Sequence, residues 1–184
     1  MSIVAVKVNK ESIVIAGDSQ TNWGGHKFNK KDTSDRQVNA NSKIWQVNGM
    51  VLGCAGSVAH IGILQMYCKT CKPKEMNRDS IIQWVADFKK YAAELTKEGF
   101  NDISVHGIII AEEKAFVFYD FMDAYEIKVN DFDAVGSGMW LSMGAMSVGA
   151  DPIKAVETAI KYDMYCGGEI TTLTINKTNT NVAN

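Results

Sequence analysis

The chain has 184 residues, of which 46% are hydrophobic and 22% are charged, and its formal net charge is −2. This composition is typical of a globular protein, the length predicts one domain, and the slightly negative charge argues against a nucleic-acid-binding role. No apolar run approaches the roughly 20 residues that a membrane-spanning helix needs, and no signal peptide is recognisable. We therefore expect no membrane segment and a cytoplasmic location in which the four cysteines stay reduced.

The first half of the chain predicts a hairpin, a loop, a second pair of strands and two helices. Strands are expected at 2–8, 12–18, 42–47 and 50–55. The polar segment 23–39 predicts a long surface loop. Apolar residues at helical spacing predict a first helix that stops by Pro73: Val58, Ile61, Leu64 and Cys68. A second helix is capped by Asn77 and ends before Gly99, with an apolar stripe of Ile81, Val85, Phe88, Ala92 and Leu95.

The second half predicts four strands, two helices and a last strand. The four strands are expected near 103–111, 114–120, 123–128 and 132–136. The run 139–147 is compatible with a helix. Asp151 and Pro152 start the next helix, whose stripe is Ile153, Val156 and Ile160 and whose end is expected at Gly167-Gly168. A strand at 169–175 precedes a polar tail. The periodicity alone predicts an α+β fold with mostly antiparallel sheets.

Ser2 lies directly after the initiator methionine and opens the first predicted strand. Removal of Met1 is usual when the second residue is small. A serine exposed in this way carries a hydroxyl and a free α-amine on one residue, so that one residue supplies both nucleophile and base.

Five short elements follow Ser2 in order: Gly17-Asp18-Ser19-Gln20, Asn41-Ser-Lys43-Ile-Trp45, Cys54-Ala-Gly-Ser57, Gly136-Ser-Gly138 and Asp163-Met-Tyr-Cys166-Gly-Gly168. With them, the chain from Ser2 to about Ile175 resembles the proteasome β-subunits and HslV-type peptidases, which are N-terminal-nucleophile hydrolases. The resemblance implies a four-layer αββα sandwich over 1–176, a tail at 177–184, and hydrolysis without a metal or organic cofactor. It also implies polypeptide substrates, stacked rings of identical subunits and an ATP-dependent unfoldase as a candidate partner.

The chain departs from the family pattern at three places. The nucleophile would be Ser2 where the family usually has threonine, and Cys166 stands where the family has serine. The segment 24–39 also looks longer than its family counterpart, which affects the shape of the site mouth.

The resemblance implies a catalytic role for seven residues. Lys43, supported by Asp18, would keep the Ser2 α-amine neutral, and Gly56 N–H would bind the oxyanion. Asp163 would orient Ser2 together with Ser137 and Cys166; its place on the Ile153 stripe separately predicts an inward side chain. Substrate contacts would come from Gln20, Thr21, Asn22, Cys54 and Val58.

Structural interpretations stay open for the same residues. Lys43 could be a solvated strand residue, Asp18 a turn former, Gly56 a turn glycine and Cys166 a small core residue. Asp163 could equally be a last-turn aspartate that faces solvent.

Other motifs do not indicate a second kind of site. The pair Cys68 and Cys71 has no second pair to complete a zinc site, even with His60 nearby. Gly136-Ser-Gly138 lacks the third glycine of a dinucleotide-binding loop, and Ala145 to Gly149 lacks the first glycine of a serine-hydrolase elbow. His26, His60 and His106 show no ligand spacing and are interpreted as structural or surface residues.

Three functions follow from these observations. The first is a peptidase that uses Ser2. The second is a small-molecule amide hydrolase on the same fold. The third is a ring-forming scaffold without catalysis, if Met1 stays on and blocks the amine.

Overall fold

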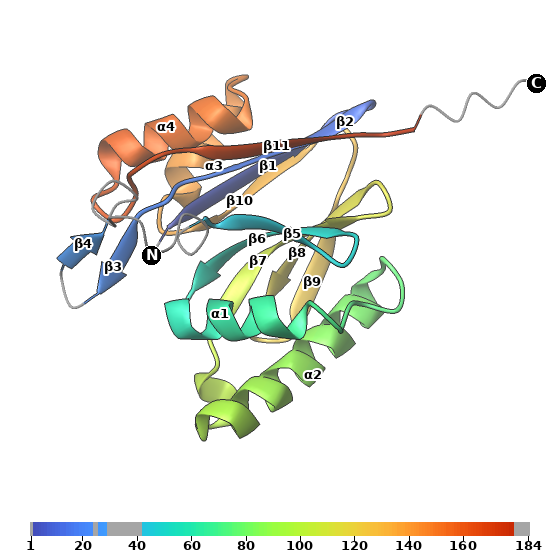
Figure 1. The fold of residues 1–184 in the computed structure, drawn as a ribbon. Helices are drawn as coiled ribbons and strands as arrows, with labels where there is room; N and C mark the ends of the chain where they lie inside the picture. Colours follow the sequence, from blue (N-terminus) through green and yellow to red (C-terminus); the bar gives the residue numbers. More distant parts are fainter. Residues whose placement is uncertain (1, 24–25, 29–41, 179–184) are drawn as a thin grey trace, which may run out of the picture.

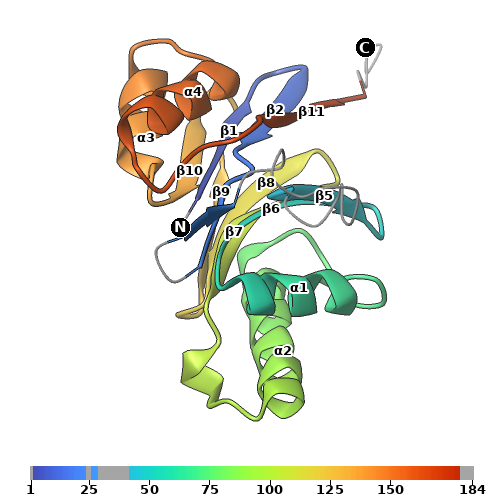
Figure 2. The same ribbon diagram turned by 60° about the vertical axis from the view of Figure 1, so that its left-hand side comes forward.

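Two antiparallel sheets face each other and each carries a pair of helices on its outer side, in a computed structural model that describes residues 2–23, 26–28 and 42–178 (Figures 1 and 2). The first sheet has the order β10 (Phe132–Gly136), β1 (Ile3–Val8), β2 (Ser12–Gly17) and β11 (Thr171–Asn176). The second has the order β5 (Ile44–Val47), β6 (Met50–Gly56), β7 (Val105–Ala111), β8 (Lys114–Tyr119) and β9 (Asp123–Ile127).

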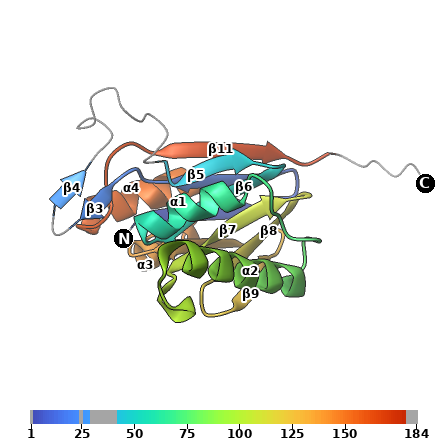
Figure 3. The ribbon, with the colours of Figure 1, turned by 60° about the horizontal axis from the view of Figure 1, so that its bottom comes forward.

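The helices form the outer layers. α3 (Met139–Ser147) and α4 (Pro152–Tyr162) cover the first sheet, whereas α1 (Val58–Tyr67) and α2 (Arg78–Thr96) cross the outer face of the second (Figure 3). A single 3₁₀ turn, η2 (Phe100–Asp102), joins α2 to β7. This arrangement confirms the predicted α+β, αββα sandwich. None of the helices in the described ranges is long and apolar enough to cross a membrane.

Strand β1 lies in the interior of the first sheet and is buried on both faces. Val4, Val6 and Val8 pack against the second sheet, and Ile3 and Ala5 pack under α3 and α4. Successive strand residues point to opposite faces, so burial of both faces accounts for the apolar run Ile3 to Val6 that starts β1. The start of β1 is therefore buried between neighbouring elements, and Ser2 is buried with it.

Residues close in sequence determine where two helices and one hairpin turn begin. Asn77 accepts a hydrogen bond from Ser80 N–H (2.9 Å), and Asp151 accepts one from Lys154 N–H (2.8 Å) ahead of Pro152, as predicted. Between β5 and β6, Asn48 and Gly49 both have positive φ, as a tight two-residue hairpin turn requires.

The buried faces of three helices differ from the predicted stripes. Val58, Leu95 and Ile153 are exposed by 55%, 53% and 38%. α4 instead packs through Pro152, Ala155, Val156 and Ala159, because small residues let its axis approach the sheet. It also ends at Tyr162, earlier than the predicted Gly167-Gly168, since Asp163 already has an extended backbone conformation.

The predicted loop 23–39 is wrong at its start. Residues Thr21–Trp23 (β3) and His26–Phe28 (β4) pair as a short antiparallel hairpin that projects at the end of the molecule where β1 begins (Figures 1 and 3). Residues 24–25 and 29–39 lie outside the described part of the chain. In the predicted tail, Lys177 N–H donates to the Glu11 carbonyl (2.9 Å) and Thr178 N–H donates to Glu113 Oε1 (2.8 Å); residues 179–184 lie outside the description.

Candidate active site

Ser2 is anchored through its backbone by the turn that follows β10. Ser137 Oγ and Gly138 N–H both donate to the Ser2 carbonyl oxygen, at 3.3 and 3.4 Å. Gly136 has φ +109°, and a Cβ at this position would overlap the same carbonyl oxygen. The Gly136-Ser-Gly138 turn therefore requires glycine at its first position. The turn fixes the position of the Ser2 backbone, and Ser2 is only 2% exposed.

Asp18 lies at the end of β2 and is fully buried. Its Oδ1 accepts from Ile3 N–H (3.1 Å) and its Oδ2 accepts from Gly167 N–H (3.0 Å). Burial raises the pKa of Asp18, while the Gly167 hydrogen bond and the charge of Lys43 act in the opposite direction. Asp18 therefore joins the start of β1 to the loop after α4 through a fully buried carboxylate.

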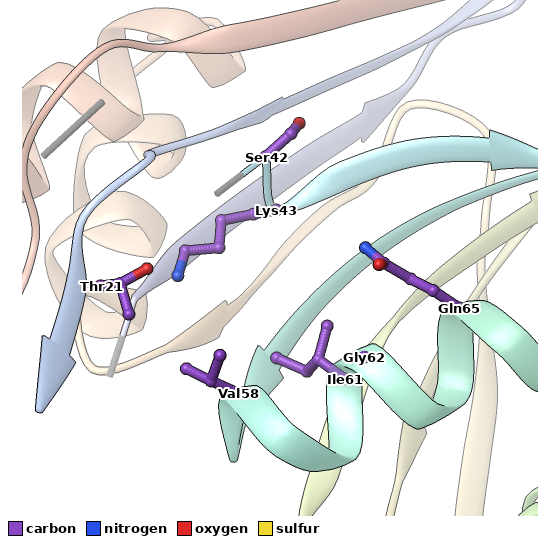
Figure 4. A pocket seen from close by; sticks show the side chains of 7 residues that line it. All are labelled: Thr21, Ser42, Lys43, Val58, Ile61, Gly62 and Gln65. Carbon is purple, nitrogen blue, oxygen red and sulfur yellow. The ribbon is translucent and has the colours of Figure 1, made fainter. Parts of the chain in front are cut away.

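Lys43 directly precedes β5, is only 7% exposed, and extends between the layers toward Thr21 (Figure 4). Burial lowers the pKa of Lys43, and the negative charge of Asp18 partly restores it. A buried lysine beside a buried carboxylate excludes the interpretation of Lys43 as a solvated strand residue. The charge of each of these two buried groups thus shifts the pKa of the other.

Asp163 and Cys166 form a second group of polar side chains, next to Ser137. Asp163 Oδ1 accepts from Tyr165 N–H (2.9 Å), and Oδ2 accepts from Cys166 Sγ (3.3 Å), which lies 3.8 Å from Ser137 Oγ. Burial raises the pKa of Asp163, but the hydrogen bond from Tyr165 N–H and the nearby Ser137 hydroxyl and Cys166 thiol outweigh it, and the pKa is lowered. Asp163 is half-buried rather than fully inward-facing, because its carboxylate folds back onto its own loop.

Cys166 is buried, with 4% of the residue exposed. Burial, reinforced by the negative charge of Asp18, raises its pKa to about 12. Cys166 also packs against Ile3 and Ala159 in the core under α4. The core interpretation of Cys166 and its place beside Ser137 and Asp163 thus hold together.

Gly56 ends β6 immediately before α1. Its φ is +132°, and a Cβ would lie 2.7 Å from the Ser104 carbonyl oxygen, so the turn requires glycine. Ser57 N–H donates to that same oxygen at 3.1 Å. The interpretation as a strand-to-helix turn glycine is confirmed, and the turn lies at the positive end of the α1 dipole.

A cavity of about 210 Å³ opens beside Lys43 (Figure 4). One face of α1 forms one wall through Val58, Ile61, Gly62 and Gln65, and Thr21 lies across from it. Thr21 and Val58 were predicted to contact substrate. Ile61, Gly62 and Gln65 were missed, although their i, i+3, i+4, i+7 spacing from Val58 marks them as one helix face; Ser42, beside Lys43, was missed as well.

Three predicted substrate contacts are not placed at this cavity. Cys54 is fully buried with Leu52 and Leu64 between the second sheet and its helices, so it cannot line an open pocket. Gln20 is 3% exposed and its Nε2 donates to the Met164 carbonyl (3.2 Å), which gives its side chain a structural contact. Asn22 belongs to β3, but its side chain lies outside the description.

Among the described residues, no three potential ligands gather into a metal site. Cys68 is fully buried and burial raises its pKa to about 12, which makes it a poor metal ligand. Ser19 is a further buried polar residue that the sequence did not single out: its Oγ accepts from Glu169 N–H at 2.8 Å and ties β2 to the segment before β11.

Comparison with known proteins gives structural matches only. No family model and no curated protein sequence matches the chain. Solved structures match over nearly its whole length. "Thiobacillus denitrificans BPH" has a TM-score of 0.81 at 20% identity, covering 95% of this chain and 97% of its own. This chain has a proteasome-like fold. Two further structures share this fold. HslV from Trypanosoma brucei matches with a TM-score of 0.64 at 16% identity, covering 96% of this chain and 100% of its own. Anbu, the ancestral beta-subunit, from Yersinia bercovieri matches with a TM-score of 0.65 at 14% identity, covering 95% of this chain and 81% of its own.

Proposed function

We propose that this chain is a proteasome-like peptidase in which Ser2, after loss of Met1, is the nucleophile. The observation that supports the proposal most strongly is the meeting of distant segments at the start of β1. Asp18 bonds both Ile3 and Gly167, the 136–138 turn holds the Ser2 carbonyl, and buried Lys43 lies near Asp18. A purely structural strand terminus needs no buried lysine close to a buried carboxylate, because burying charged groups costs desolvation energy.

The proposed reaction has two halves. Ser2 Oγ attacks the carbonyl carbon of a peptide bond while its proton moves to the neutral α-amine of the same residue. The tetrahedral oxyanion is bound by Gly56 N–H, and its collapse breaks the C–N bond as the ammonium returns the proton to the leaving amine. Water, deprotonated by the same amine, then hydrolyses the Ser2 ester and regenerates the hydroxyl.

Lys43 and Asp18 would set the protonation state of the base. A positive charge close to the α-amine disfavours a second positive charge there, so the amine stays neutral near pH 7. Asp18 in turn stabilises the charged form of Lys43 against its burial. Asp163, Ser137 and Cys166 would orient the terminus from the other side through the hydrogen bonds described above.

The cavity beside Lys43 would bind one substrate side chain. Val58 and Ile61 give it an apolar wall, and Gln65 and Thr21 add polar groups, so a side chain of medium size fits its volume of about 210 Å³. On the likeness of fold, we extend the proposal to polypeptide substrates, stacked rings of identical subunits and an ATP-dependent unfoldase that feeds them.

The test is intact mass after incubation with a β-lactone that acylates terminal hydroxyl nucleophiles. The wild type is compared with Ser2→Ala, and with Ser2→Thr as the variant that restores a hydroxyl. We expect loss of Met1 and one adduct in the wild type and in Ser2→Thr, and no adduct in Ser2→Ala. Because a structure of the neighbouring protein contains epoxomicin, that compound is a second probe.

Two outcomes would contradict the proposal. Retention of Met1 without an adduct would favour the scaffold function. An adduct at Ser2 with turnover of small amides but not of peptides would favour the small-molecule amide hydrolase.

A further inference from the structure

His60 is a buried polar residue that the proposed mechanism leaves unused. It lies in the first turn of α1, three residues after Ser57, and is 5% exposed. Its Nδ1 accepts a hydrogen bond from Ser104 N–H (3.0 Å), and its Nε2 lies 2.9 Å from Glu98 Oε2. A backbone N–H can only donate, so Nδ1 carries no proton and Nε2–H donates to Glu98.

Ser104 connects His60 to the Gly56 turn. The Ser104 carbonyl oxygen accepts from Ser57 N–H, and it is the atom that a Cβ on Gly56 would meet at 2.7 Å. The N–H of Ser104 is held by His60 and its carbonyl packs against the turn. Ser57, the first turn of α1, His60 and Ser104 thus form a closed loop of contacts around Gly56.

We infer that His60 is a positioning residue that sets the Gly56 N–H for oxyanion binding through the Ser104 backbone. The inference rests on the proposed function, which assigns the oxyanion to Gly56. Without an acceptor at Nδ1, Ser104 N–H turns toward water, and its carbonyl and the adjoining turn shift with it. A displacement of about 1 Å at a catalytic group lowers a rate by about 100-fold.

Two near-isosteric variants separate this role from simple core filling. His60→Asn places an amide oxygen close to the Nδ1 position and keeps an acceptor for Ser104. His60→Gln reaches toward Glu98 but removes that acceptor. We expect kcat of His60→Gln to fall about 10- to 100-fold with KM near the wild-type value. His60→Asn should stay within about threefold of the wild type.

Hydrogen exchange at the Ser104 amide provides a readout that does not depend on activity. Protection should be kept in His60→Asn and lost in His60→Gln. The rate of β-lactone acylation at Ser2 should follow the same order. If either variant fails to fold, Glu98→Ala, which changes a half-exposed side chain and releases Nε2, should give an intermediate loss of kcat and of Ser104 protection.

The failures of the two proposals are distinguishable. Equal kcat in both His60 variants, with an active wild type and an inactive Ser2→Ala, would overturn the positioning role and leave the peptidase intact. Unchanged Ser104 protection in His60→Gln would overturn it as well. Full activity in Ser2→Ala would instead remove the peptidase mechanism itself.

Discussion

Replacement of Asp18 by asparagine tests the buried hydrogen-bond network that supports the Ser2 terminus. Each Asp18 carboxylate oxygen accepts one backbone N–H, from Ile3 at 3.1 Å and from Gly167 at 3.0 Å. Asparagine keeps one acceptor and turns a donor toward the other N–H. The unsatisfied buried donor costs about 1–3 kcal/mol. Lys43 also loses its negatively charged neighbour, which adds to the loss in stability. This addition is limited, because burial already lowers the pKa of Lys43 and Lys43 can release its proton.

The expected loss in free energy of unfolding for Asp18→Asn is therefore about 2–4 kcal/mol. For a chain of this size it corresponds to a fall in Tm of about 4–16 °C. Urea unfolding followed by circular dichroism measures it. Asp163→Asn, at a half-buried carboxylate, is the matched control and should lose less than about 1 kcal/mol. In a Lys43→Met background the Asp18→Asn loss should shrink by more than about 0.5 kcal/mol. An Asp18→Asn protein within 0.5 kcal/mol of the wild type would refute the reasoning.

Three further predictions concern the same region. Because burial raises the pKa of Asp18, the folded state binds the extra proton, so stability should fall as pH rises from about 4 through the folded pKa; Asp18→Asn should lack this component in urea titrations run in steps of pH. Gly56→Ala places a Cβ 2.7 Å from Ser104 O at positive φ, and it should cost more than about 1 kcal/mol and at least 10-fold in hydrolysis, whereas unchanged Tm and kcat would contradict the close approach. Iodoacetamide at pH 8 should modify half-buried Cys71 well before Cys166, whose pKa is about 12; peptide mapping of the labelled protein checks the order.

The features that the sequence predicted correctly depend on short-range chemistry. Alternation and apolar runs located the strands around Ser2, and the caps at Asn77 and Asp151 located two helix starts. These signals involve residues fewer than five positions apart, so one sequence is enough to recognise them.

The features that it missed depend on packing between distant segments. Leu95 is exposed. Lys89 on the same helix is buried, because its Nζ donates to the Asp120 carbonyl (2.7 Å) and lies 4.6 Å from the centre of the Phe100 ring. Cys54 points toward α1 and α2 because it shares a strand face with Leu52, and only the position of the helices shows that this face is closed.

The candidate site shows the same division. The family resemblance selected Asp18, but its bond to Gly167 spans 149 positions of sequence. No local pattern encodes a contact of that separation. His60 is the sharper case: its partners are Glu98 and Ser104, 38 and 44 positions away, and nothing near it in sequence distinguishes it from an ordinary core histidine.

The pairing of β1 has a consequence for the order of events during synthesis. During synthesis, β1 can pair with β2 soon after both are made. Its other edge can pair only after β10 has been made, and Asp18 can accept the Gly167 hydrogen bond only after Gly167 has been made. Contacts between residues far apart in sequence form slowly, because the long intervening segment must close first. The hydroxyl and amine of Ser2 thus acquire their surroundings only after the chain has been made as far as Gly167. Under the proposed function, a nascent or truncated chain is therefore inactive as a hydrolase, and completion of the fold controls the reactivity of Ser2.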